Sequence, residues 1–493
     1  MNKLGKFAAA CAGVLCAFGA GVARANDYYV AKTGAEGNPG TVEEPFATIS
    51  AAIGAAQEGD TIHVAPGDYN EWGLKIEKAL RIVGEGETRE DVCVYGYEAQ
   101  PTEQGTYQTG RRIFYMTADA TIANLTVKNG GFTTDGKDAN GGNVFMDAGT
   151  ITNCVIQGGY VNHTADAGIR GALGGNLYMR GGLVVDCEIK DGRIYNQNGA
   201  GGGGNVVMYG GGARLMRCKG TGARRTVGNN PASFTDQSGG SGIYMNGDTT
   251  AENCLVTDNA GSCGAVSMAG ASRLVNCTVA GNHDNYQGRN GLYVRDALPL
   301  VINTIAFGDA TDASSWGGLN GGCFKNCAVS GAEISGGTSC LALSGQASSY
   351  FEDLTDFRPL KSSVVLEAGS QELYELYARS ATDLDGCERL VDTIDIGCYE
   401  TVVEGFGCSG SVSKQSARRL EPLTFGADSI GADDVTYTWD FGNGATMVTR
   451  DKTVSYAFPT CGVFKAVLTA DGGVKGRETF ELLPITIVTE VLY

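Results

Sequence analysis

The stretch GGNLYMRGGLVVDCEIKDG, Gly174–Gly192, decides the fold because the chain repeats it. It aligns with GGNVFMDAGTITNCVIQGG at Gly141–Gly159 and with GGNVVMYGGGARLMRCKGTG at Gly203–Gly222, and three weaker copies follow. The last residue of the first apolar triplet marks each copy, and successive markers lie 23 to 37 residues apart: Met146, Met179, Met208, Met245, Met268 and Val294. Such a period indicates a repeat architecture in which each unit stacks on the next.

A second marker precedes the second apolar run of each unit: Asn124, Asn153, Asp186, Arg217, Asn253, Asn276, Asn303 and Asn326. Alternation such as that of Thr150–Ile156, with glycine-rich turns between the runs, favours short strands over helices. At about 3.3 Å per residue, the shortest units accommodate three strands around a narrow apolar centre. The sequence therefore predicts an all-β, right-handed parallel β-helix, with the handedness taken from the usual crossover preference. A leucine-rich-repeat horseshoe fits less well because leucine is sparse.

Side-chain directions follow from this arrangement. Gly174 and Gly175 are expected to form a turn with positive φ, Leu177 and Met179 to point inward, and Asp186 to bond the turn backbone. The cysteines after the second marker are expected to pack as an interior column, with disulfides between neighbouring coils as the alternative: Cys154, Cys187, Cys218, Cys254, Cys277 and Cys327. No metal site is predicted, because the thiols form no CxxC pair and have no His companion.

The start of the chain indicates the compartment of the protein, and the net charge limits the partners that it can bind. Residues 1–25 have the pattern of an export signal, with Lys3 and Lys6 before an apolar run and Ala23-Arg24-Ala25 as the cleavage site. No later stretch has the roughly 20 apolar residues of a membrane span. The formal net charge of −18 argues against nucleic acid as a partner. We therefore expect a secreted or cell-surface protein without a membrane span.

Both ends of the solenoid carry recognisable sequence. Four apolar residues at helical spacing predict an amphipathic cap helix before a strand at Thr61–Val64: Ile49, Ala52, Ile53 and Ala56. With the stretches YYVA, PFATI and GDTIHVAPGDY, this region resembles the N-terminus of secreted right-handed β-helix repeat proteins of the pectate-lyase-like superfamily. DFRPLKSSVVLEAG and DLDGCERLVDTIDIGCYE resemble the C-terminal end of those proteins. The resemblance implies a β-helix domain over residues 26–400, and it specifies fold better than activity.

Residues 401–493 are expected to form a second domain. Tyr437–Asp471 resembles a PKD domain, a small Ig-like β-sandwich, and its WDFGNG stretch departs from the WDFGDG signature only at Asn443. We expect Trp439 to lie in the core. Four alternate residues of a later strand are expected to point their side chains inward: Phe464, Ala466, Leu468 and Ala470. The resemblance implies a spacer or a module that contacts carbohydrate or protein. Cys408 and Cys461 are candidates for a disulfide, although their spacing fixes no connectivity.

Long insertions leave the same corner of four successive units and are expected to emerge side by side on one flank: Lys128–Asn140, Gly158–Leu173, Lys190–Gly202 and Lys219–Gly240. They hold the candidate ligand-binding residues His163, Asp166, Arg170, Arg193, Tyr195, Arg224 and Arg225. Arginines clustered on an acidic protein suit an anionic ligand such as a uronate or a sulfated glycan. The alternative is that these side chains are solvated loop charges.

Two hypotheses on function stay open at this point. The first is a non-catalytic module that binds glycan or a cell-surface partner. The second is a polysaccharide lyase or glycoside hydrolase acting on an anionic polysaccharide in the same groove. A lyase needs a base, for which His163, Arg170, Arg193 and Tyr195 are candidates, and a cation or Ca²⁺ to neutralise the uronate.

A hydrolase instead needs two separated carboxylates. The adjacent pair Asp433 and Asp434 lies in the second domain and is assigned to a turn. No catalytic residue is assigned, and Ca²⁺ in the case of a lyase is the only cofactor considered.

Overall fold

The computed structural model describes residues 25–98, 110–134, 140–164, 173–196, 201–227, 239–261, 264–284, 291–308, 316–318, 321–331, 334–389, 393–401, 406–431, 435–472 and 477–489. Residues 1–24 of the expected export signal, the candidates Asp166 and Arg170, and the pair Asp433 and Asp434 lie outside the described residues.

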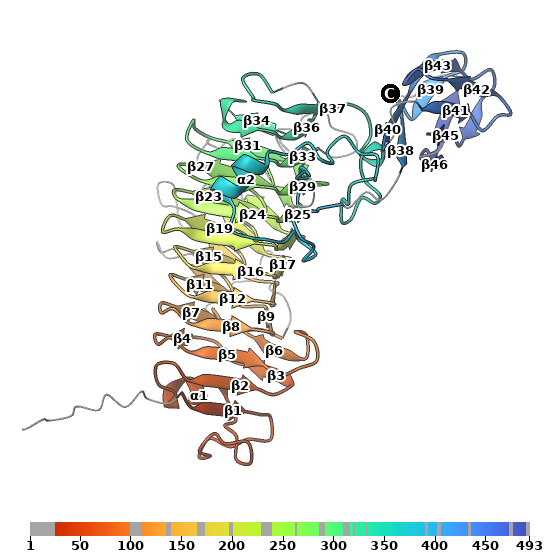
Figure 1. Cartoon of the computed structure of the whole chain (residues 1–493). Helices are drawn as coiled ribbons and strands as arrows, with labels where there is room; N and C mark the ends of the chain where they lie inside the picture. The colour runs from red at the N-terminus through yellow and green to blue at the C-terminus, as the bar shows by residue number, and fades with distance from the viewer. Residues whose placement is uncertain are drawn as a thin grey trace, which may run out of the picture.

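Residues 27–343 wind into a stack of coils whose strands pair in parallel with the coils above and below (Figure 1). Sheet A consists of β1 Asp27–Val30, β2 Thr61–Val64, β5 Arg81–Gly84, β8 Thr121–Ala123, β12 Thr150–Thr152, β16 Leu183–Val185, β20 Ala213–Met216, β24 Thr249–Glu252, β28 Arg273–Val275, β32 Leu300–Ile302 and β35 Phe324–Lys325. Sheet B consists of β3 Gly67–Asn70, β6 Val92–Tyr95, β9 Thr126–Lys128, β13 Val155–Gln157, β17 Glu188–Lys190, β21 Lys219–Thr221, β25 Leu255–Thr257, β29 Thr278–Ala280, β33 Ile305–Phe307, β36 Ala328–Ser330 and β37 Leu341–Leu343.

Sheet C closes the coil with β4 Leu74–Ile76, β7 Phe114–Met116, β11 Val144–Met146, β15 Leu177–Met179, β19 Val206–Tyr209, β23 Ile243–Asn246, β27 Val266–Ala269, β31 Leu292–Val294 and β34 Trp316–Gly318. The parallel β-helix predicted from the repeats is therefore confirmed. The coils place the repeat markers in register, since Met146 pairs with Met179, Met179 with Met208, and Met208 with Met245.

The structure corrects the prediction of three strands per coil. The chain forms a fourth parallel sheet between sheets B and C, in the coils with long insertions and also in the shortest repeat unit, between Met245 and Met268. Sheet D consists of β10 Gly131–Thr134, β14 Tyr160–His163, β18 Arg193–Asn196, β22 Arg224–Val227, β26 Ala260–Gly261 and β30 His283–Asp284. The four long insertions thus begin as strands of sheet D.

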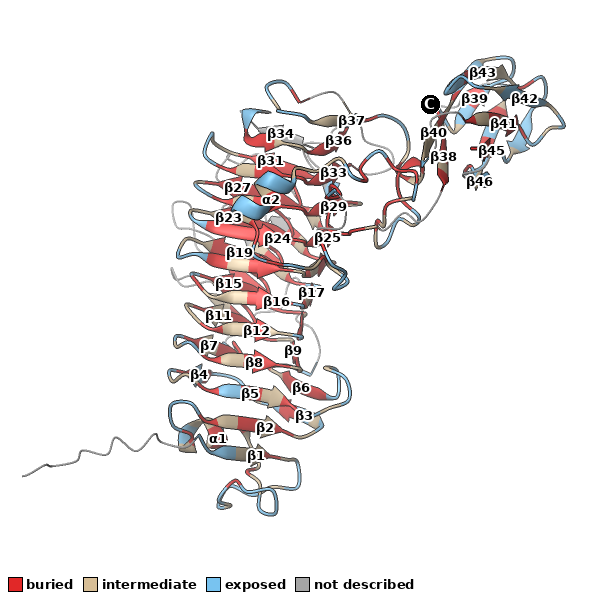
Figure 2. Cartoon of the chain, in the orientation of Figure 1, coloured by how far each residue is buried: buried red, intermediate tan, exposed pale blue. Residues whose placement is uncertain are grey.

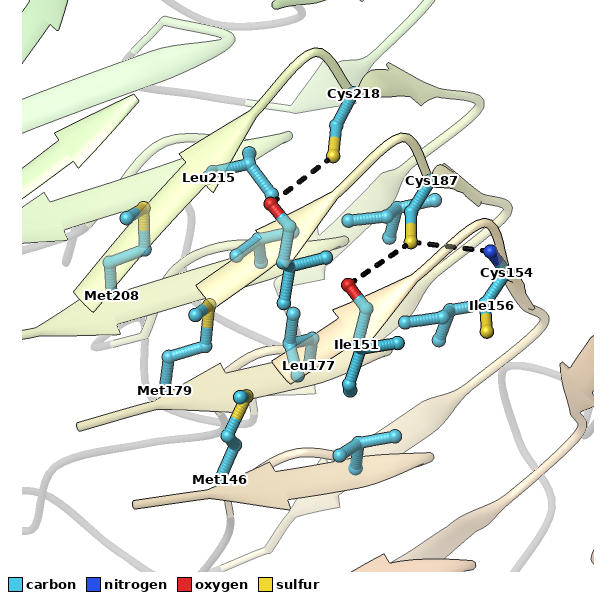
Figure 3. Packing of buried hydrophobic residues seen from close by; sticks show 14 of the residues in the cluster. Met146, Ile151, Cys154, Ile156, Leu177, Met179, Cys187, Met208, Leu215 and Cys218 are labelled. Atoms are coloured by element: carbon cyan, nitrogen blue, oxygen red, sulfur yellow. Dashed lines mark hydrogen bonds between the residues drawn. The ribbon is translucent and has the colours of Figure 1, made fainter. Parts of the chain in front are cut away.

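The interior of the coil is apolar and is built from ladders of like residues. Met146, Met179 and Met208 stack along one wall, and the column Cys154, Cys187 and Cys218 stacks along another (Figure 3). Each of these thiols donates to the carbonyl two residues before it, as Cys187 does to Val185 at 3.1 Å. All the described cysteines are free, so the interior column is confirmed and its disulfide alternative is not formed.

The second marker column forms the turn between sheets A and B. All eight markers have φ between 46° and 55°, the left-handed region that asparagine tolerates better than most residues. Asn153 donates to the side-chain oxygen of Asn124 at 3.0 Å. The prediction that Asp186 bonds the turn backbone is wrong. Its carboxylate instead binds the guanidinium of Arg217 at 2.7 and 2.8 Å.

A buried asparagine ladder explains why GGN precedes three strands of sheet C, β11, β15 and β19. The Asn176 side-chain oxygen accepts from the Gly159 amide at 2.8 Å, and its amide group donates to the Lys190 carbonyl at 2.8 Å and to Asn205 at 2.9 Å. Gly174 has φ of 67°, as expected of the turn, but Gly175 does not have the positive φ that was predicted for it. A Cβ on Gly175 would lie 2.3 Å from the Gly204 carbonyl, so only glycine fits between the coils.

The N-terminal end is capped as predicted. Helix α1, Ile49–Ala55, buries Ile49 and Ala52 against the first coil. The Thr48 hydroxyl caps its N-terminus, and the Glu71 carboxylate accepts from the amides of Ile49 and Ser50 at 2.8 and 2.9 Å. This carboxylate satisfies helix donors that have no partner within the helix.

After β37 the chain passes through η3, Ala347–Ser349, and runs back over the coils. We call residues 352–389 and 393–401 the strap. The strap contains helix α2, Gln371–Tyr377, which lies over sheet A (Figure 1). It is bonded to the turn column: Asn253 donates to the Tyr374 hydroxyl at 2.9 Å, and Asn303 accepts from the Ser370 amide at 2.8 Å.

The C-terminal sandwich consists of β38 Gly407–Val412, β39 Ser416–Arg418, β40 Pro422–Ile430, β41 Thr436–Asp440, β42 Thr446–Thr449, β43 Thr453–Ala457, β44 Gly462–Phe464, β45 Val467–Asp471, β46 Arg477–Glu481 and β47 Ile485–Val488. Its pairing is antiparallel except for β39 with β47. Trp439, Ala466, Leu468 and Ala470 are buried in its core, as predicted, and Phe464 is partly buried against it. Buried positions alternate with more exposed ones along β41 and β45 (Figure 2). Cys408 and Cys461 are free, so the suggested bridge is not formed.

Candidate functional site

The described candidate residues lie on three neighbouring strands of sheet D. His163 ends β14, Arg193 and Tyr195 belong to β18, and Arg224 and Arg225 begin β22. Because the strands are parallel and in register, Arg193 pairs with Arg224, and Ile194 pairs with Arg225. Residues far apart in the sequence are therefore brought to one flank, as the repeat predicted.

The two faces of sheet D divide these residues. Side chains alternate along a strand, so Arg193, Tyr195 and Arg224 share one face, and Arg225 lies on the other. The second face carries a small apolar cluster of Phe132, Val161 and Ile194. His163 and Arg225 lie on this second face and are 3 % and 5 % exposed, so they are not loop charges in solvent.

On β18 and β22 the outer face is more accessible and adjoins the turn after sheet B, whereas Tyr160 and Asn162 of β14 on the same face are buried. The Arg224 side chain is 40 % exposed and donates to the carbonyl of Asp258, whose carboxylate lies 3.4 Å away. Arg193 has a buried Nε without a hydrogen-bond partner among the described residues. Burial raises the pKa of the Asp191 carboxyl, against the lowering effect of Lys190, Arg224 and Arg193. The outer face thus combines two guanidinium groups, one phenol and two carboxylates.

A second concave site lies on sheet A and was missed by the sequence analysis. A pocket of about 350 Å³ opens between this sheet and the end of α2. Its walls carry three arginines, Arg214, Arg273 and Arg379. The repeat places Arg214 and Arg273 on sheet A, but no sequence pattern brings the strap to them from more than a hundred residues further along the chain.

Neither site holds an obvious metal centre. Within the described ranges, no three His, Cys, Asp or Glu side chains are grouped so as to hold a metal ion. Over the same ranges, we find no helix with the length and apolar character needed to cross a membrane.

The family comparisons agree with this architecture. The PKD domain family matches residues 407–479, where the antiparallel sandwich lies. The chain combines a parallel β-helix with a PKD domain. A second family, described as a protein of unknown function (DUF1565), matches residues 32–259 of the β-helix. A comparison with curated proteins found no match to the sequence.

Among solved structures, the chain is similar to the pectate lyase Pel9A, with 13 % identity, a TM-score of 0.38, and coverage of 78 % of this chain and 98 % of the other. A rhamnogalacturonan lyase is 14 % identical, with a TM-score of 0.29 and coverage of 60 % and 84 %. A pectin methylesterase from carrot is 14 % identical, with a TM-score of 0.28 and coverage of 64 % and 88 %.

Proposed function

We propose that this protein is an extracellular, non-catalytic module that binds acidic polysaccharide along the outer face of sheet D. The observation that carries the proposal is the register pair Arg193 and Arg224, with Tyr195 on the same face. Guanidinium groups bind carboxylate and sulfate through paired hydrogen bonds, and a tyrosine ring adds a flat surface for a sugar.

The geometry favours a polymer over a single small anion. Adjacent strands place Arg193 and Arg224 about 4.8 Å apart along the stack. A chain with a repeated negative charge can contact both groups at once. The overall charge of −18 repels such a polymer elsewhere on the surface, so binding depends on these arginines.

The test is affinity electrophoresis in gels that contain polygalacturonate, alginate or chondroitin sulfate, with neutral dextran as the reference. We expect retardation by at least one acidic polymer and release by added salt. The double variant Arg193→Gln/Arg224→Gln should weaken binding at least tenfold. Arg180→Gln is the matched control, because Arg180 is a half-exposed arginine paired with Asp147 away from sheet D. Equal retardation of the double variant and the wild type would refute the proposal.

A hydrolase is the second candidate, and one observation favours it. Asp191 and Asp258 occupy the same turn of coils that are separated by one further coil, at Gly222. Two strand spacings separate the two turns by about 9.6 Å. An acid and a base that invert a glycosidic bond have carboxyl groups about 6.5–9.5 Å apart. The raised pKa of Asp191 suits the acid.

Product analysis separates the two candidates. Incubation with the polymers that bind should yield new reducing ends if the hydrolase holds, and Asp191→Asn should abolish them while binding remains. Absorbance by unsaturated sugars would indicate a lyase instead. Binding without either product supports the non-catalytic module.

A further inference from the structure

The pocket on sheet A has a floor made by the β-helix itself. Arg214 pairs with Thr250, and Thr250 pairs with Arg273, so the three residues form one column across β20, β24 and β28. Their neighbours Leu215, Ala251 and Leu274 are buried in the core. Alternation along the strands therefore directs the column outward, into the pocket.

The wall opposite the floor comes from the strap. Leu376 and Tyr377 at the end of α2, followed by Arg379, line the pocket together with Gly212 and Asp248 from the β-helix. The Leu376 side chain is 59 % exposed, and the Tyr377 ring lies 5.9 Å from the guanidinium carbon of Arg273. The wall thus offers an apolar and aromatic surface beside the positive floor.

Two carboxylates hold the arginines in place before any ligand arrives. Glu252, whose side chain has no exposed surface, accepts from the Arg214 guanidinium at 2.8 Å and from the Arg379 amide at 2.9 Å. Asp248 accepts from Arg273 at 2.8 Å. A guanidinium has five N–H donors, so Arg214 and Arg273 each keep donors for a ligand after these contacts.

Arg379 is the least engaged cation of the three. Its side chain is exposed, and among the described residues it donates to the Ala378 carbonyl alone. The pocket has a net positive charge, although the net charge of the protein is −18. Three arginines, Arg214, Arg273 and Arg379, outnumber the two carboxylates of Asp248 and Glu252. Its volume of about 350 Å³ lies at the lower end of the range of about 300–1,000 Å³ for small-molecule sites, which suits one or two sugar residues.

We propose that this pocket binds a single anionic sugar residue, whose carboxylate or sulfate contacts Arg273 and Arg379 while its ring packs against Tyr377. The ligand class rests on the proposed function, but the site does not, because sheets A and D lie on different sides of the coil. The pocket would hold a chain end or a side-branch sugar, whereas sheet D would hold the body of a polymer.

Titration of the full chain with monosaccharides, followed by NMR of the ligand at low ionic strength, tests this inference. The probes are glucuronate, galacturonate and glucose 6-sulfate, with glucose and acetate as references. Binding of a uronate or of the sulfated sugar at least fivefold more tightly than both references supports the inference, and which anion binds identifies the charged group. Equal binding of glucose, equal binding of acetate, or no binding of any anionic sugar would overturn it.

Variants locate the site. Arg273→Gln and Arg379→Gln should each weaken binding of the anionic sugar at least fivefold. Arg81→Gln is the matched control, because Arg81 is an exposed arginine in the same column of sheet A at a distant coil. Unchanged affinity in both pocket variants contradicts the inference. If Arg193→Gln/Arg224→Gln loses polymer binding but keeps sugar binding, the two sites are independent. If that variant loses sugar binding as well, the sugar binds on sheet D and the pocket assignment is wrong.

Discussion

The side-chain amide of Asn143 donates a hydrogen bond of 2.8 Å to the side-chain oxygen of Asn176 in the next coil, and both residues are buried. Asn176 repeats the contact with Asn205, and Asn259 repeats it with Asn282 at 3.0 Å. The ladder lies where the chain leaves sheet B for sheet D, and it satisfies backbone groups that no strand pairs. The position of the candidate site therefore depends on it.

Replacing Asn176 with alanine should destabilise these coils. The change leaves the Gly159 amide without a partner and removes one of the two hydrogen bonds that the Lys190 carbonyl accepts, and a buried unsatisfied group costs about 1–3 kcal/mol. We expect a clear fall in the urea midpoint and faster amide exchange at Gly159. Asn70→Ala is the control, since Asn70 is exposed and donates to the Tyr95 and Gly96 carbonyls at 3.2 and 3.3 Å, so its loss should cost less than that of the buried Asn176. Equal midpoints for the two variants would show that the ladder is dispensable.

Thiol labelling should separate the interior cysteines from Cys340. Burial raises the pKa of Cys154, Cys218 and Cys254, whereas the neighbouring Cys327 lowers the pKa of Cys340 to about 7. Because the thiolate is the reactive form, iodoacetamide at neutral pH should modify Cys340 well before the column. Mass spectrometry of the native protein checks the order, with Cys340→Ser as the control. Early labelling of the column, or a disulfide within it, would contradict the packing.

Stability of the strap should fall as the pH rises. Burial raises the pKa of Asp395 to about 6 and that of Glu400 to about 8, against the lowering effect of Arg389. The native chain therefore binds more protons than the unfolded chain above about pH 4, and stability is lost progressively as pH rises through these native values. Amide exchange at Gly397, which donates to Asn303, reports the local stability.

Glu400→Gln should flatten the upper part of this pH dependence, whatever it does to the mean stability, because glutamine does not titrate. Glu375→Gln is the control on the same segment, since Glu375 is exposed on α2. A wild-type slope between pH 6 and 8 that persists in Glu400→Gln would mean that another group titrates there.

A cavity in the core of the PKD domain should lower the unfolding temperature of this domain and leave that of the β-helix unchanged. Trp439 is fully buried and its ring lies 5.4 Å from that of Phe425. Removal of such a side chain typically costs about 3–5 kcal/mol, a large part of the stability of a domain of this size. For Trp439→Ala we expect a lower calorimetric transition for this domain alone, with Val448→Ala, an exposed position, unchanged. Joint loss of both transitions would indicate one cooperative unit.

The sequence predicted the coils because each interior column repeats its residue type. Met146 and Met179, or Cys154 and Cys187, stand at equivalent positions of successive units, so their register follows from alignment. Sheet D was not predicted because its apolar cluster takes a single residue from each of three strands: Phe132, Val161 and Ile194. The repeated GGN was visible, but its asparagine was not assigned a role.

The candidate site was predicted only in part. Periodicity placed Arg193, Tyr195 and Arg224 on one flank, but it did not show that His163 and Arg225 face the buried side of the same sheet. The pocket under α2 depends on a return segment without repeat character. Its contact with Glu252 comes from Arg379, and no periodicity relates two residues that far apart.

The strap also makes the C-terminal coils of the β-helix more stable than the N-terminal coils. It ties Asn253, Asn276 and Asn303 to one continuous return segment, so the last coils cannot peel away singly. Among the described residues, the first coils contact their neighbours and α1, and Arg89 contacts Glu188 at 3.4 Å. Under mechanical load or heat, the stack should therefore unfold first at its N-terminal end. The coils that form the pocket on sheet A should be among the last to unfold.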